Sequence, residues 1–139
     1  MPKVSRNIPL PEVRRNMTEA LVVSFARTNN ETLIRTFLRD LFTMSEETMI
    51  AKRLMTAILL QKGYNYLTIC RMLKLSKTTV NSVRRDLAKG GEGYKQIYRR
   101  LFREKPWADR FSRWLDALRL PAKDSLSNMK RWEKAPEEL

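Results

Sequence analysis

The chain has 139 residues, 42% of them hydrophobic and 31% charged, which fits one globular domain with an appendage and excludes a disordered chain. Its formal net charge of +13 favours a polyanionic partner. The sequence has no histidine, and its one cysteine, Cys70, excludes internal disulfides and thiolate metal clusters. We therefore expect a cytoplasmic protein that is not an enzyme and uses no metal or cofactor. No apolar run is long enough to span a membrane, so we expect no membrane partner.

Long periodic stretches with few glycines and prolines predict an all-α fold. After a loose basic arm over residues 1–10, a first helix is expected over 11–28, with its prolines at the start, where they are tolerated. Asn29 and Asn30 are expected to end this helix and to cap a second helix over 31–42. We assign residues 1–42 to N-terminal helices that mediate dimerisation.

A third helix is predicted over residues 45–62. Thr43 and Glu46 have the spacing of a capping box, in which each side chain bonds to the backbone amide of the other residue. Gly63 supplies the left-handed residue that ends many helices. This helix is apolar on most of its sides, so it is either the central strut of the fold or part of a subunit interface.

Residues 66–85 have the pattern of a helix-turn-helix. Ile69 and Leu73 share a face of a first short helix, predicted over 66–73, and Val80 and Val83 share a face of a second helix, predicted over 77–89. Asn65 and Ser76 are expected to cap these two helices. Further packing roles are expected for Cys70 and Leu75, and a positive φ is expected at Lys74 in the sharp turn. An ordinary amphipathic hairpin has the same spacing.

The polar face of the second helix favours DNA over that simpler interpretation. From Ser76 to Arg85 it carries only basic and small hydrogen-bonding side chains, and residues 45–90 have a net charge of +6, against +3 for residues 1–44 and +4 for residues 91–139. We expect DNA contacts from ten residues: Lys74, Ser76, Lys77, Thr78, Thr79, Asn81, Ser82, Arg84, Arg85 and Lys89. Among these, Lys77 suits guanine, Asn81 adenine and Thr78 a thymine methyl group, and the later cations suit phosphates. Thr79 has the alternative role of capping its own helix.

Two more helices are predicted after the glycines at positions 90, 91 and 93. The first covers residues 94–103, and the second covers 107–118 and is rich in aromatic residues. The second either covers the core or contacts a partner. A weak helix is expected within residues 122–139. We assign residues 43–103 to a DNA-binding core and residues 104–139 to a C-terminal helical extension.

Residues 42–101 resemble the Trp repressor superfamily, in particular its YerC/YecD type. The resemblance is carried by FTMSEET, AKRLMTAILLQKG, SKTTVNSVRRDL and GGEGYKQIYRRL. It implies an all-α, intertwined homodimer whose helix-turn-helix binds double-stranded DNA. It also implies a possible ligand residue at Arg53, which matches the first of two arginines that hold tryptophan in such repressors. For Arg53 itself we expect a salt bridge or a phosphate contact. Ser82 takes the place of the second arginine, which makes a small-molecule corepressor doubtful.

Together these patterns predict a sequence-specific regulator of transcription, repressor-like, that contacts the major groove with helix 77–89. A basic RNA-binding protein, or one associated with a mobile element, is the alternative. Glu46 and Glu47 are explained as acids at a helix start and not as catalytic groups.

Overall fold

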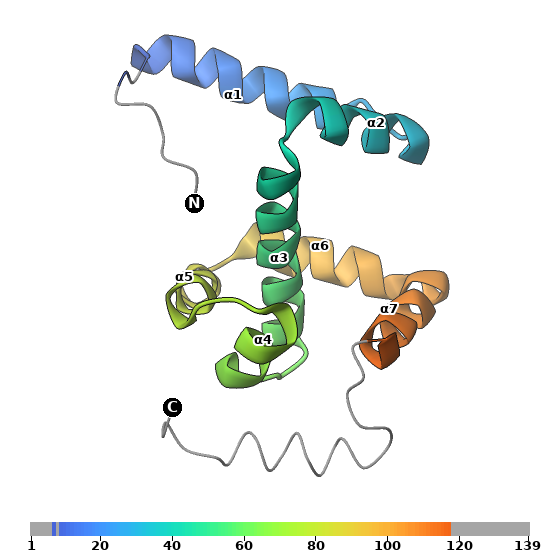
Figure 1. Ribbon diagram of the computed structural model, residues 1–139. Coiled ribbons are helices and arrows are strands. Elements are labelled where there is room, and N and C mark those ends of the chain that lie inside the picture. Colours follow the sequence, from blue (N-terminus) through green and yellow to red (C-terminus); the bar gives the residue numbers. More distant parts are fainter. Residues whose placement is uncertain (1–6, 8, 118–139) are drawn as a thin grey trace. The chain divides into compact units, whose positions relative to one another are not determined.

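The computed structural model describes residue 7 and residues 9–117 (Figure 1). All seven elements in these residues are α-helices, which confirms the all-α prediction: α1 (Pro11–Ala26), α2 (Glu31–Leu41), α3 (Met44–Gln61), α4 (Tyr66–Leu73), α5 (Lys77–Ala88), α6 (Glu92–Arg103) and α7 (Lys105–Ala117). None of these helices has the length and apolar character needed to cross a membrane. The weak helix expected within residues 122–139, and most of the basic arm, lie outside the described residues.

Two helices begin earlier than predicted. Residues 92 and 93 form the first turn of α6 because Gly91 precedes it in the left-handed conformation, with φ of 55°. A Cβ on Gly91 would lie 2.8 Å from the Cα atom of Leu87, so only glycine fits the passage from α5 to α6. Helix α7 begins at Lys105, so Pro106 lies in its first turn. Proline is tolerated there because a backbone N–H in the first turn has no acceptor within the helix.

The chain divides into two compact units, residues 1–50 and residues 51–139, and the division falls inside α3. In the first unit, Asn30 caps α2 as predicted, because its Oδ1 atom accepts a hydrogen bond of 3.0 Å from the Leu33 amide. The rings of Phe25 and Phe37 meet edge to face, 5.5 Å apart. No residue of α1 or α2 is buried. The large apolar side chains left exposed in this unit are Leu10, Val13, Met17, Leu21, Val22, Leu33, Leu41, Met44 and Ile50.

The predicted capping box starts α3. The Glu46 amide donates to Thr43 Oγ1 over 3.2 Å, and the Thr43 amide donates to Glu46 Oε1 over 3.0 Å. The hydrogen bond from the Thr43 backbone, followed by that from its side chain, lowers the pKa of Glu46. The helix also ends as predicted, since Gly63 has a φ of 93° and the Tyr64 amide donates back to the Leu59 carbonyl over 3.1 Å.

The second unit has its own hydrophobic core. Its buried cluster combines α3, α4, α5 and α7, through Ile58, Leu59, Ile69, Leu73, Val80 and Phe111. Four consecutive residues of α3, positions 56–59, are buried, so this half of the apolar helix is a central strut. Phe111 of α7 is only 3% exposed. Helix α7 therefore completes the core that supports the helix-turn-helix.

Candidate nucleic-acid interface

Helices α4 and α5 form the predicted helix-turn-helix. Lys74 follows α4 with φ of 54° and ψ of 54°, the left-handed conformation expected for the sharp turn. That conformation costs a residue with a side chain about 1–2 kcal/mol. The turn is closed by the Leu75 amide, which donates to the Cys70 carbonyl over 3.0 Å. Asn65 caps α4 as predicted, because its Oδ1 atom accepts from the Thr68 amide over 2.9 Å.

Helix α5 is held against the core by one apolar stripe. Val80 and Val83 are both 0% exposed. Ser76 caps the helix as predicted, since its Oγ atom accepts from the Thr79 amide over 3.3 Å. The Ser76 and Thr79 hydroxyl groups also lie 3.0 Å apart in a hydrogen bond. The Thr79 side chain is therefore engaged in the local cap.

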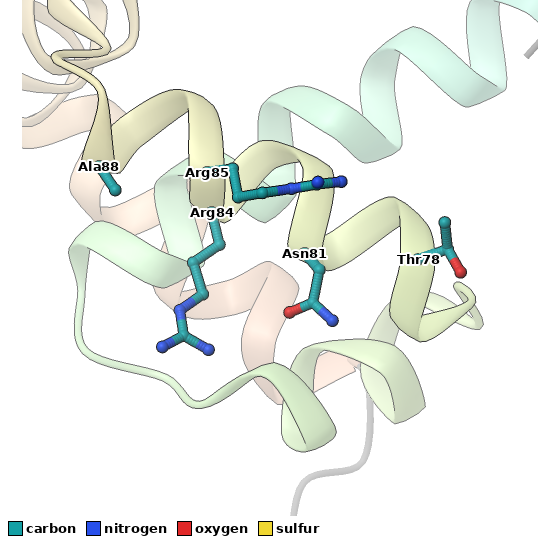
Figure 2. A pocket seen from close by; sticks show the side chains of 5 residues that line it. All are labelled: Thr78, Asn81, Arg84, Arg85 and Ala88. Carbon is teal, nitrogen blue, oxygen red and sulfur yellow. The ribbon is translucent and has the colours of Figure 1, made fainter.

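The opposite side of α5 forms an open groove, drawn in Figure 2. It is lined by Thr78, Asn81, Arg84, Arg85 and Ala88. Successive positions in this set are three residues apart, except for the adjacent Arg84 and Arg85, so their side chains project from one side of the helix. Arg84 and Arg85 are exposed, and Asn81 is half-buried. Four of the ten predicted DNA contacts thus lie together on one surface that combines two cations with hydrogen-bonding groups.

The other six predicted contacts lie around this groove or on a neighbouring flank. Lys74, Ser76 and Lys77 are exposed at the turn and at the start of α5, and Lys89 is exposed just after its end. Ser82 and Thr79 are half-buried and do not line the groove. Their spacing from Asp86, four and seven residues, places all three on the same flank of α5.

Arg53, the possible ligand residue, makes an ion pair, which is one of the two roles expected for it. Its guanidinium lies 3.6 Å from the carboxylate of Asp86, which is the one acid in α5. The Arg53 side chain is 21% exposed and that of Asp86 is 50% exposed. The pair joins α3 to α5, and Asp86, the only acid of the helix, does not line the groove.

Sequence reasoning missed two features of this surface. Ala88 lines the groove, and its spacing of seven from Asn81 was the available signal. The pairing of Asp86 with Arg53 joins residues from two helices, and no local pattern indicates it.

Cys70 has the predicted packing role, because it is half-buried beside the core. Burial raises the pKa of its thiol, although the charge of Lys77 opposes this.

Comparison with known protein families identifies the family of this chain. Residues 17–102 match the Trp repressor protein family, and this covers more than half of the chain. No curated protein and no solved structure matches significantly. The chain belongs to the Trp repressor family, whose members are helix-turn-helix DNA-binding regulators of transcription, typically dimeric, and not enzymes.

Proposed function

We propose that this protein is a sequence-specific regulator of transcription, repressor-like, that acts in the cytoplasm and contacts the DNA major groove with α5. The observation that carries the proposal is the α5 groove, in which Thr78 and Asn81 lie beside Arg84 and Arg85. Amide and hydroxyl groups suit base edges, and exposed arginines suit phosphates. A helix capped by Ser76 and held by two fully buried valines presents these groups from a fixed backbone.

The proposed contacts divide along the helix. Lys77, Thr78 and Asn81, in the first half of α5, contact bases, because the N-terminal half of a recognition helix enters the groove. Cations at the turn and in the second half of α5 contact phosphates. These phosphate contacts come from Lys74, Arg84, Arg85 and Lys89. Ser76, Thr79 and Ser82 complete the proposed surface, with Thr79 and Ser76 also forming the cap.

We further propose a homodimer in which residues 1–42 mediate assembly, residues 43–103 bind DNA and residues 104–139 extend the DNA-binding core. Support comes from the described residues of the first unit, where α1 and α2 have no buried residue and nine large apolar side chains are exposed. A second copy would cover this surface. Two recognition helices spaced about 34 Å apart would favour a two-fold symmetric DNA site.

An effector other than tryptophan, or none, fits this chain better than tryptophan. Ser82 stands at a position where the family resemblance implies an arginine, and Arg53 is already paired with Asp86. We assign the chain to the YerC/YecD type on the motifs described above. Added tryptophan is expected to leave DNA affinity unchanged, whereas a tenfold gain in affinity on adding it would contradict this assignment.

Selection of bound sequences from a random duplex pool tests the proposed function. A two-fold symmetric consensus is expected, and absence of enrichment would count against sequence-specific binding. On the enriched duplex, Lys77→Ala and Asn81→Ala are each expected to cost about 1–3 kcal/mol in binding and to relax the consensus. Arg85→Ala is expected to weaken enriched and random duplexes alike. Equal losses of affinity on both duplexes for all three variants would refute this division of roles.

A separate measurement compares duplex DNA with structured RNA at the same salt concentration. Stronger binding of the RNA would favour an RNA-binding protein.

A further inference from the structure

A second cationic surface lies on α6, separate from the α5 groove. Lys95, Arg99 and Arg103 follow one another at intervals of four residues, and Arg100 lies beside them. The three arginines are exposed and Lys95 is half-buried. We call these four residues the α6 cationic face. Within the described residues, none of them forms a salt bridge, and the nearby acid Glu92 accepts a hydrogen bond from Gln96 instead.

The opposite, apolar side of α6 explains why this face points to solvent. Tyr98, Leu101 and Phe102 pack against the core of the second unit. The Lys62 ammonium lies 3.8 Å from the centre of the Phe102 ring, and the Trp107 ring meets Phe102 at 5.2 Å. The rings of Tyr98 and Phe102 are therefore engaged in packing within the second unit. The face left outside carries cations and no aromatic residue.

These residue types suit the backbone of a nucleic-acid duplex. Lys95 and Arg103 are separated by two intervals of four residues, so the row extends roughly 12 Å along the helix axis, the length over which one DNA strand presents three or four phosphates. The row lacks the amide and hydroxyl side chains, such as the Asn and Thr of α5, that suit adenine and thymine. Recognition of single strands uses exposed aromatic rings, whereas the aromatic residues of α6 are all half-buried. A second copy of the chain is a poor occupant, because protein interfaces are depleted of charges at their core.

We propose that the α6 cationic face binds the phosphate backbone of a second DNA duplex, without sequence preference, while α5 holds its own site. This inference rests on the proposed DNA-binding function. In Figure 1, α5 lies to the left of α3 and α6 extends to its right, both within the second unit. Because the two helices extend on different sides of α3, we expect a duplex bound along α5 to leave α6 uncovered, so that one molecule joins two DNA segments.

A two-duplex capture experiment tests this. The full chain is loaded onto an immobilised duplex of the enriched sequence, the retained protein is measured, and a fluorescent random-sequence duplex is then added. The double variant R99Q/R103Q is compared with R110Q/R113Q, which removes the same charge from exposed arginines of α7. Thermal melting of both variants checks that the helices remain folded.

The wild type and R110Q/R113Q are expected to capture the second duplex. R99Q/R103Q is expected to be retained on the first duplex as well as the wild type is, but to capture about tenfold less of the second duplex, with a weaker salt dependence. Retention without capture by the wild type, or equal capture by the two variants, would overturn the inference and leave the proposed function intact. Failure of the wild type to be retained would overturn both. Preferential capture of a structured RNA added in place of the second duplex would overturn the assignment to DNA.

Discussion

The two compact units of this chain differ in how they use apolar residues. Helices α1 and α2 have no buried residue, and Met17 is 61% exposed on α1. In the second unit, Ile69, Val80 and Val83 are 0% exposed. Burial of an apolar side chain contributes about 1.5–3 kcal/mol. The second unit therefore contains the interactions that fold it, whereas the first unit has apolar surface whose stabilising effect is realised only when another surface covers it.

Replacement of one phenylalanine in each unit gives the largest expected contrast. Phe111→Ala removes a ring that is 3% exposed and lies in the core cluster, so the free energy of unfolding is expected to fall by about 3–5 kcal/mol. Phe25→Ala is the matched control, because Phe25 is half-buried and its described ring contact is with Phe37. Its loss is expected to be less than half as large. Equal losses in urea denaturation would show that the two units do not differ as described.

A charge placed on the exposed apolar surface of α1 tests whether a second copy covers it. Leu21 is 42% exposed, and its burial in a dimer would contribute about 1.5–3 kcal/mol. Leu21→Asp is therefore expected to raise the dissociation constant of the dimer about tenfold to a hundredfold, measured by sedimentation. Asn16→Asp introduces the same charge at an exposed polar position and is expected to leave the dimer unchanged. A monomeric wild type, or the same effect from both variants, would contradict the dimer.

The local parts of this structure were predictable from the sequence, and the long-range parts were not. The bounds of α4, the caps at Asn65 and Ser76, and the left-handed Lys74 follow from residues within one helical turn of one another. Phe111 packs beside Ile58 and Leu73, which lie far away along the chain. Its helical spacing indicated an apolar face on α7 but could not indicate which surface that face would contact.

The same distinction holds for the candidate site. The exposed polar side of α5 followed from periodicity, because burial of Val80 and Val83 turns Thr78, Asn81 and Arg85 outward. The position of Arg53 did not follow. A salt bridge or a phosphate contact was expected for Arg53, but its partner Asp86 lies on another helix and no local pattern indicated it.

A smaller effect on stability is expected at the start of α3, which lies in the first unit. Thr43→Ala removes the hydroxyl that accepts from the Glu46 amide, which is expected to cost about 1 kcal/mol. Thr43→Ser keeps the oxygen and is expected to retain most of the stability. Chemical denaturation measures both variants. A loss from Thr43→Ser as large as that from Thr43→Ala would assign the effect to packing of the methyl group.

Ionisation of Glu46 in this cap is expected to make the stability of the protein depend on pH. Hydrogen bonds from Thr43 lower the pKa of Glu46 in the folded state, so its stabilising contribution is present above the unfolded-state pKa and is lost as pH falls through the folded-state pKa. Glu46→Gln keeps an acceptor for the Thr43 amide but does not titrate. The wild type is expected to be slightly more stable than Glu46→Gln at neutral pH, and the difference is expected to vanish in acid. A difference that is constant with pH would contradict the assignment to ionisation.

The smallest expected effect is the coupling energy of an ion pair. We compare a pair that joins two helices with a pair that lies within a single helix. A double-mutant cycle with Arg53→Gln and Asp86→Asn is expected to give a coupling of about 0.2–1 kcal/mol, reduced by the exposure of Asp86 and by added salt. The Arg35–Glu31 pair of α2 is the control, because its partners are 64% and 69% exposed and lie four residues apart. Both couplings are expected to be small. Only the first pair links α3 to α5, so only its loss is expected to alter binding of the enriched duplex. If Arg53→Gln leaves that binding unchanged, packing of Val80 and Val83 is sufficient to position α5 without the ion pair.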